Sequence, residues 1–281
     1  MKKIAVIGAG TMGHGIAQVF AMRNYPVNLI DINEKVLKNA EQKIKISLKK
    51  FEEKNKIDDA DKVIRNINFS TDINKVRDDD LIIEAIVEKV SIKKNLYQQL
   101  DDICRKDAIF ASNTSSIPIT KLAEFTERPG LIIGMHFFNP PQLMKLVEII
   151  VGEKTSDKTR EKITMLTESL GRQPITVIDS PAFVTSRLIM IMINEAVECV
   201  SEKIATIRDI DKAMKLGMNH PMGPLELADL VGLDVVLAIM ETMYEGFDDE
   251  KYKPSSLLVK KVKKGEIGKK TGKGFYEYKQ S

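Results

Sequence analysis

The chain has 281 residues, of which 43% are hydrophobic and 30% charged, and 43 basic residues against 40 acidic ones give a formal net charge of +3. This balance excludes a disordered, collagen-like or low-complexity chain, and the length predicts about two domains. A net charge so close to zero provides no general attraction to nucleic acid or to an acidic membrane, so we expect neither as a partner.

The cysteines and apolar segments point to the cytoplasm. Cys104 and Cys199 form no Cys-x-x-Cys pair, so we expect two buried free thiols and no metal site. The apolar run Ile4–Ile7 ends at Gly8, which is too short for the core of a signal peptide. No later segment approaches the roughly 20 apolar residues of a membrane span. The expected location is therefore cytoplasmic.

The N-terminal third begins with a predicted strand, glycine-rich turn, helix and second strand. The strands are Ile4–Ile7 and Val27–Ile30. From Asn33 to about Lys56, apolar side chains recur at near-helical spacing, which predicts a long amphipathic helix. Its exposed face would be basic, because eight lysines stand against three glutamates between Lys35 and Lys56.

Short runs rich in isoleucine and valine then alternate with helical patterns as far as residue 180. Such runs are typical of buried strands in a mostly parallel α/β sheet. The predicted strands are Ile67–Phe69, Leu81–Val87, Ala108–Ala111, Leu131–Phe138, Leu146–Val151 and Ile175–Ile178.

Beyond residue 182 the pattern is helical only. Pro181 stands at the changeover, where a proline often opens a helix. The predicted helices are Phe183 to about Ala205, Arg208–Leu216, Leu225–Met243 and Ser255–Lys264. We therefore predict an α/β domain over residues 1–182 and an all-helical domain over residues 183–281.

The glycine-rich turn carries a dinucleotide-binding fingerprint. Gly8, Gly10 and Gly13 follow a strand and open a helix, and Asp31 ends the next strand eighteen residues after Gly13. The glycines let the backbone approach a pyrophosphate at the helix N-terminus, and the Asp31 carboxylate suits ribose hydroxyls but not a 2′-phosphate. The pattern predicts a Rossmann-type domain that binds NAD. The expected contacts are Gly8, Ala9, Gly10, Thr11, Met12, Gly13 and Asp31.

Polar residues follow three of the predicted strands, at the edge where open α/β sheets bind ligands. They are Glu84 and Glu88, the run Ser112–Ser116, and His136 with Asn139. The alternative for Ser112–Ser116 is an ordinary loop that caps the next helix.

Nicotinamide chemistry on an alcohol requires a group that moves the alcohol's proton, and a neutral histidine suits this task near pH 7. Of the three histidines, His136 ends a strand on the ligand side, whereas His14 lies in a helix start and His220 in a loop. Glu148 interrupts an apolar run, where an unpaired charge is unfavourable, so it is the candidate to orient His136. A strand glutamate can equally project to solvent.

Six motifs along the whole chain together resemble the L-3-hydroxyacyl-CoA dehydrogenase family. They are Gly8–Gly13, Ser112–Ser116, His136–Pro140, Met144–Glu148, Pro221–Pro224 and Gly268–Tyr276. The resemblance implies an NAD-dependent oxidoreductase that interconverts (S)-3-hydroxybutanoyl-CoA and acetoacetyl-CoA. It also implies His136 as the acid/base, Glu148 as its partner, and Ser115 as a hydrogen-bonding group on the substrate's β-oxygen.

The resemblance further implies residues that contact the cofactor and the CoA moiety. The residues that would line the dinucleotide are Glu88, Lys93, Asn113, Ser115, Asn139 and Lys270. Those that would meet CoA are Ser47, Lys50 and Lys54, on the basic helix. An excess of lysine on that helix suits CoA phosphates, although a solvated basic face is the alternative.

The segment Pro181–Arg187 departs from the family pattern. Ser186 replaces an asparagine that reaches the active site in many members, and Ala182 replaces a glycine. Serine can still donate one hydrogen bond but reaches less far, and we expect Ser186 to face the site. The apolar run Leu188–Ile193 predicts that the helical domain closes the cleft and forms a homodimer.

Two other functions fit part of this pattern. A non-enzymatic, crystallin-like protein would keep Asp31 and the glycines but need not keep His136 and Glu148. Dehydrogenases of other β-hydroxy acids share the two-domain layout, but they use a lysine as the acid/base.

Overall fold

The computed structural model describes residues 1–278 and separates the chain into two compact units. Unit 1 is Met1–Asp179, and unit 2 begins at Ser180. This division lies three residues before the domain boundary predicted from the sequence. Each unit has its own hydrophobic core, so each is described separately.

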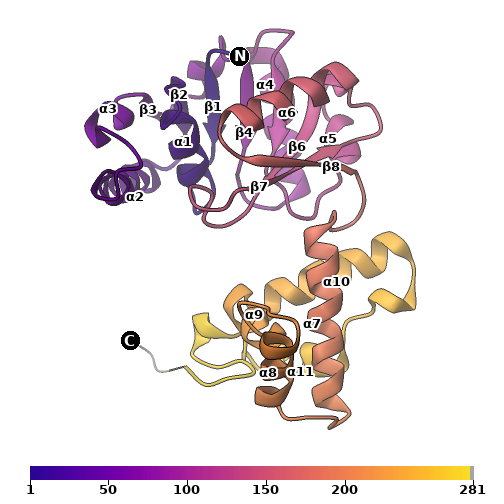
Figure 1. The fold of residues 1–281 in the computed structure, drawn as a ribbon. Helices are drawn as coiled ribbons and strands as arrows, with labels where there is room; N and C mark the ends of the chain where they lie inside the picture. Colours follow the sequence, from indigo (N-terminus) through magenta and orange to yellow (C-terminus); the bar gives the residue numbers. More distant parts are fainter. Residues whose placement is uncertain (279–281) are drawn as a thin grey trace. The chain divides into compact units, whose positions relative to one another are not determined.

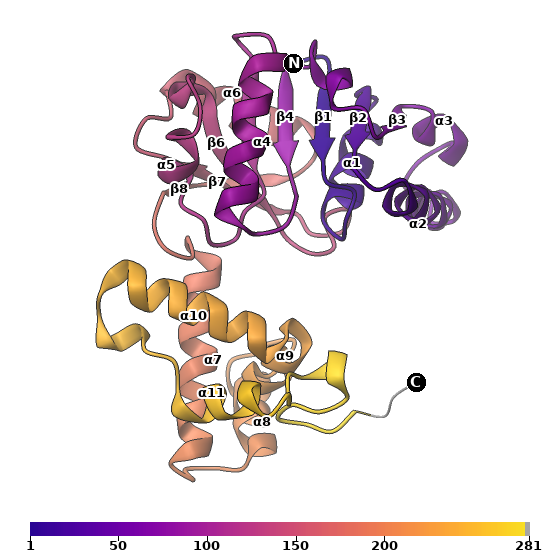
Figure 2. The same ribbon diagram turned by 180° about the vertical axis from the view of Figure 1, so that it is seen from behind.

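Unit 1 is built on one sheet (Figures 1 and 2). Within residues 1–278 the sheet has eight strands, in the order β3-β2-β1-β4-β5-β6-β7-β8. The strands are β1 (Ile4–Ile7), β2 (Val27–Ile30), β3 (Ile67–Ser70), β4 (Leu81–Glu84), β5 (Ile109–Ser112), β6 (Ile132–Phe137), β7 (Leu146–Val151) and β8 (Gln173–Ile178). All neighbouring strands are parallel except β6 and β7, which confirms the predicted mostly parallel α/β class.

Helices cover both faces of this sheet. They are α1 (Gly13–Ala21), α2 (Glu34–Glu53), α3 (Ala60–Ile64), α4 (Val90–Ile103), α5 (Ile119–Ala123) and α6 (Asp157–Ser169), with 3-10 turns at Ile73–Val76 and Pro129–Leu131. α1 and α6 lie in front of the sheet in Figure 1, and α4 lies in front of it in Figure 2. Apolar side chains recur every three or four residues on the inner face of each longer helix, so burial against the sheet stabilises the helices.

Residues 180–278 form helices and 3-10 turns without a strand, as predicted for the second half. The helices are α7 (Thr185–Ser201), α8 (Ile207–Gly217), α9 (Pro224–Val231), α10 (Leu233–Phe247) and α11 (Ser256–Lys263), with 3-10 turns at Glu250–Tyr252 and Lys269–Thr271. Their core is lined by Met190 and Ile193 of α7, Leu225 of α9 and Met240 of α10.

Two predictions about unit 2 were wrong. The stretch Leu225–Met243 is two helices, because Gly232 between them has a φ of 102° that a helix cannot continue through. Pro181 does not open α7, which begins at Thr185. Ala182 and Phe183 before it have φ angles of 61° and 55°, and the complete burial of their side chains stabilises this left-handed turn.

The two cysteines are free, but only Cys104 is buried. The expectation for Cys199 was wrong because α7 buries one stripe only, and Cys199 lies two residues beyond Val197, off that stripe. Among the described residues, no helix is both long enough and apolar enough to span a membrane.

Candidate active site

The glycine-rich loop joins β1 to α1 and turns tightly because of two of its glycines. Gly8 has a φ of 96°, and a Cβ there would lie 2.5 Å from the carbonyl oxygen of Ala85. A Cβ at Gly13 would lie 1.7 Å from the carbonyl oxygen of Gly8. A Cβ at Gly10, in contrast, would meet nothing within 4 Å, so this glycine borders open space. The loop therefore leaves open space beside its backbone at the N-terminus of α1, which is an arrangement that suits a pyrophosphate.

Asp31 follows β2 and lies beside this loop. Its Oδ2 accepts a hydrogen bond from the amide of Ala9 at 2.8 Å, and its Oδ1 accepts one from the amide of Asn33 at 2.9 Å. Two carboxylate oxygens offer about four acceptor positions, so capacity remains for ribose hydroxyls. The loop and the Asp31 carboxylate thus both fit a dinucleotide. Nδ1 of His14 in α1 lies 2.6 Å from the carbonyl oxygen of Gly10.

His136 and Glu148 face each other across the one antiparallel pair of strands, β6 and β7. Nδ1 of His136 lies 2.7 Å from Oε2 of Glu148, and the two residues are 6% and 0% exposed. Glu148 therefore does not project to solvent, which excludes that alternative. A carboxylate accepts hydrogen bonds, so this contact selects the tautomer of the neutral imidazole that has its proton on Nδ1 and its lone pair on Nε2.

Ser115 completes a line of three side chains. Its Oγ lies 3.2 Å from Nε2 of His136, on the side of the ring opposite Glu148. The ring of Phe138 lies 4.8 Å from the imidazole, centroid to centroid. Residues from three strands or strand ends, β5, β6 and β7, are thus brought together although the sequence separates them by up to 33 positions.

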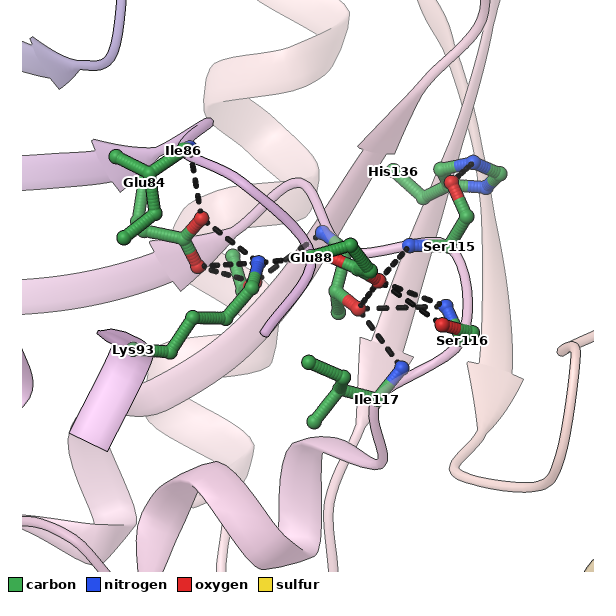
Figure 3. Close-up of polar contacts among 10 residues, drawn as sticks. Glu84, Ile86, Glu88, Lys93, Ser115, Ser116, Ile117 and His136 are labelled. Carbon is green, nitrogen blue, oxygen red and sulfur yellow. Dashed lines mark hydrogen bonds and ion pairs between the residues drawn. The ribbon is translucent and has the colours of Figure 1, made fainter. Parts of the chain in front are cut away.

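The loop that carries Ser115 is held by Glu88 (Figure 3). Oε1 of Glu88 accepts hydrogen bonds from the amides of Ser115 at 3.0 Å and Ser116 at 3.1 Å, and from the hydroxyl of Thr114. The loop does not serve to cap the next helix, because α5 has Pro118 at its N-cap and no side-chain cap bond. The helix-capping alternative for Ser112–Ser116 was therefore wrong.

Lys93 of α4 lies behind Glu88 and is 1% exposed. Its Nζ lies 2.9 Å from Oε2 of Glu88 and 2.7 Å from Oε1 of Glu84. Partial burial raises the pKa of Glu88, but the charge of Lys93 and the hydrogen bond from Thr114 outweigh it, so the pKa lies below its usual value. Glu88 is therefore ionised at neutral pH, and with 36% of its side chain exposed it can also face a ligand.

The sequence did not indicate that Lys93 binds two carboxylates. The signal was present, since a glutamate ends the apolar run Leu81–Ile83 and a lysine follows nine residues later. Such a buried charge requires a partner, but the partner's identity depends on where α4 packs.

The remaining candidate residues lie in several elements. Oδ1 of Asn113 accepts the amide of Phe137 at 2.9 Å and so joins the end of β5 to β6, and Asn139 is exposed just after β6. Ser186 is half-buried in the first turn of α7, in unit 2. Lys270, also in unit 2, lies 2.6 Å from the carboxylate of Asp234, a partner that the sequence did not indicate.

The candidate CoA residues lie at the C-terminal end of α2, where Ser47 and Lys50 are in the helix and Lys54 is its C-cap residue. Ser47, Lys50 and Lys54 are spaced by three and four residues, which places them on successive turns. Lys38 and Lys45 of the same helix pair with glutamates one turn away, but neither Lys50 nor Lys54 has a salt-bridge partner among residues 1–278.

Comparisons with known proteins agree with this architecture. A family profile described as "3-hydroxyacyl-CoA dehydrogenase, NAD binding domain" matches residues 3–180, and one described as "3-hydroxyacyl-CoA dehydrogenase, C-terminal domain" matches residues 183–278. A probable 3-hydroxybutyryl-CoA dehydrogenase of Deinococcus radiodurans is 50% identical, over 98% of this chain and 100% of its own length. A 3-hydroxybutyryl-CoA dehydrogenase of Clostridioides difficile is 46% identical, over 98% of this chain and 99% of its own length. The crystal structure of (S)-3-hydroxybutyryl-CoA dehydrogenase from Ralstonia eutropha matches with a TM-score of 0.97 and 43% identity, over 100% of both chains.

Proposed function

Because the chain belongs to the 3-hydroxyacyl-CoA dehydrogenase family, we propose that it interconverts (S)-3-hydroxybutanoyl-CoA and acetoacetyl-CoA. The chain is an oxidoreductase, and its cofactor is NAD. The proposed reaction rests on the line of Glu148, His136 and Ser115. Oε2 of Glu148 lies 2.7 Å from Nδ1 of His136, and Oγ of Ser115 lies 3.2 Å from Nε2 of the same ring. A crystallin-like role without catalysis would not require this line.

The cofactor is held by the loop Gly8–Gly13 and by Asp31. When bound, NADH would supply the hydride for reduction of the ketone, and NAD⁺ would accept it in oxidation of the alcohol. Amides at the start of α1 would hold the pyrophosphate, and the Asp31 carboxylate would bind the ribose hydroxyls and repel a 2′-phosphate. We further propose that Glu88, Asn113, Asn139 and Lys270 line the cofactor, with Lys93 acting through Glu88.

Proton transfer is assigned to His136. In reduction, the Ser115 hydroxyl donates a hydrogen bond to the β-oxygen as negative charge develops on it, and the protonated His136 donates its Nε2 proton to that oxygen. In oxidation, the neutral Nε2 takes the same proton from the alcohol. Glu148 holds Nδ1–H in both directions and stabilises the imidazolium.

The substrate's CoA end is assigned to α2. Lys50 and Lys54 are exposed, and no carboxylate within residues 1–278 forms a salt bridge with either of them, so they are suited to bind the phosphates of CoA. The hydroxyl of Ser47, one turn before Lys50, adds a hydrogen bond. We also propose that Ser186 contributes a hydrogen bond to the substrate from α7.

The assembly and location are proposed from the surface. Leu188 on α7 and Leu216 on α8 are 67% and 75% exposed, which is unfavourable in water for side chains of this size. An interface between two copies of unit 2 would cover them, so we propose a homodimer. The proposed location is the cytoplasm, where acyl-CoA and NAD would both be present.

One assay tests the proposed reaction. NADH oxidation is followed by absorbance with acetoacetyl-CoA, with a longer 3-ketoacyl-CoA, and with NADPH in place of NADH. We expect the highest kcat/KM with acetoacetyl-CoA and NADH. Absence of turnover with every 3-ketoacyl-CoA would overturn the proposal, and a preference for the longer substrate would overturn the assigned chain length.

A further inference from the structure

Glu84 ends β4 with its carboxylate buried, 1% of the residue being exposed. Its Oε1 accepts hydrogen bonds from Nζ of Lys93 at 2.7 Å and from the amide of Ile86 at 3.0 Å. Its Oε2 accepts from Oγ of Ser112 at 2.8 Å and from the same Nζ at 2.9 Å. Three donor groups of the protein thus make four hydrogen bonds to the two oxygens, so Glu84 holds other parts of the protein and not a ligand.

Two routes lead from Glu84 to the loop that carries Ser115, and Figure 3 labels the residues of the first. In the first, Lys93 binds Oε2 of Glu88 at 2.9 Å, and Oε1 of Glu88 accepts the amide of Ser115 at 3.0 Å. In the second, Ser112 accepts the amide of Thr114 at 3.1 Å, one residue before Ser115. The first route ends at Ser115, whose Oγ lies 3.2 Å from Nε2 of His136, and the second ends at the residue before it.

The ammonium of Lys93 makes the first route sensitive to the charge of Glu84. A buried ammonium needs carboxylates around it, and here it has two, at Glu84 and Glu88. If Glu84 loses its charge, Lys93 attracts Glu88 without competition and draws that carboxylate away from the loop amides. The loop, and with it the Ser115 hydroxyl, then loses its fixed position.

We propose that Glu84 is a positioning residue: through Lys93 with Glu88 and through Ser112, it fixes the Ser115 hydroxyl against Nε2 of His136. This inference rests on the proposed function of Ser115 and His136 in the reduction of a 3-ketoacyl-CoA. Glu84 itself touches neither reacting group, so its effect must pass through Ser115.

The test is a double-mutant cycle of Glu84→Gln and Ser115→Ala, with kcat for acetoacetyl-CoA, the NADH Kd and Tm measured for each enzyme. We expect Glu84→Gln alone to lower kcat about 10- to 100-fold, because small displacements of catalytic groups have effects of this order. Because Glu88 is also proposed to line the cofactor, its displacement can weaken NADH binding, so kcat is measured at saturating NADH. In the Ser115→Ala background, Glu84→Gln should have little further effect on kcat, since the two changes remove the same contact.

A matched control is Asp101→Asn, which removes the charge of another buried ion pair of unit 1, with Arg128 at 2.5 Å. It should lower Tm and leave kcat of the folded enzyme unchanged.

If Glu84→Gln does not fold, Ser112→Ala interrupts the second route more mildly, and its effect on kcat should depend on Ser115 in the same way. The inference is overturned if Glu84→Gln alone leaves kcat unchanged. It is also overturned if Glu84→Gln lowers kcat by the same factor in the wild type and in the Ser115→Ala background. An inactive wild type instead overturns the proposed function, and the inference with it.

Discussion

The His136 imidazole has a different partner on each of its two nitrogens. Glu148 lies 2.7 Å from Nδ1, and Ser115 Oγ lies 3.2 Å from Nε2. The carboxylate fixes one proton and one ring orientation, so the second nitrogen alone is left to exchange protons with a substrate. This arrangement lets one side chain act as acid in one direction of the reaction and as base in the other.

At the residue scale, we expect His136→Gln to lower kcat about 10²- to 10⁴-fold, the usual contribution of general acid–base catalysis. Glutamine can fill the space of the ring but cannot exchange a proton at neutral pH. NADH affinity, measured by fluorescence titration, should remain near that of the wild type, because the loop Gly8–Gly13 is unchanged. Loss of NADH binding would contradict the assignment, and the loop variant His220→Gln is the control that should keep full activity.

At the scale of the element, α2 shows how one helix can serve both the fold and a ligand. Leu37, Ala40, Ile44 and Leu48 form its buried stripe, which attaches the helix to the core of unit 1. The exposed lysines divide into those that pair with glutamates of the same helix and those that do not. The unpaired ones at its C-terminal end are the ones available to an anionic substrate.

We expect Lys50→Ala combined with Lys54→Ala to raise KM for acetoacetyl-CoA about tenfold or more, because each charge-assisted contact to a phosphate contributes on that order. The kcat should change little, since neither residue touches the reacting atoms. The effect should weaken at high salt and vanish with a truncated thioester that lacks the CoA nucleotide.

The matched control for α2 is Lys38→Ala with Lys45→Ala, which removes the same charge from lysines that already have glutamate partners. Equal KM increases in the two double variants would show that only the general charge of the helix matters. That outcome would remove the assigned CoA contacts.

At the scale of the whole molecule, the net charge of +3 conceals how the charges are distributed. Eight lysines lie between Lys35 and Lys56, and nine lie between Lys251 and Lys273, where Glu266 is the one acidic residue. The net charge of the whole chain therefore does not predict whether one of its segments binds an anionic ligand. The exposed apolar side chains of α7 and α8 give unit 2 a second distinct kind of surface.

We expect sedimentation equilibrium to give about twice the 31.6 kDa mass of one chain. Placing a charge at the interface with Leu188→Arg should shift the mass to that of the monomer, because burying an unpaired guanidinium is unfavourable. Met165→Arg on α6, where the side chain is 68% exposed in unit 1, is the control that should leave the mass unchanged. A wild-type mass of 31.6 kDa alone contradicts the homodimer.

Most strands and helices could be predicted because their signals are local. Runs of isoleucine and valine marked β1 to β8 to within a few residues, and α2 followed from apolar spacing. The errors lie where backbone conformation overrides side-chain pattern. Gly232 divides one apolar stretch into two helices, and the left-handed turn at Ala182 and Phe183 means that α7 begins only at Thr185. Turns of this kind depend on what the chain packs against.

By itself, the sequence determined the mostly parallel α/β class, the glycine loop followed by Asp31, and three polar groups at strand ends, since each depends on neighbours in the chain. Tertiary structure alone decided which groups meet. The antiparallel register of β6 and β7 places Glu148 opposite His136, and the packing of α4 brings Lys93 to Glu84. The sequence named Glu148 as the candidate to orient His136 because it interrupts an apolar run. The tertiary structure decides the pairing of these distant residues, because burial makes an unpaired charge unfavourable.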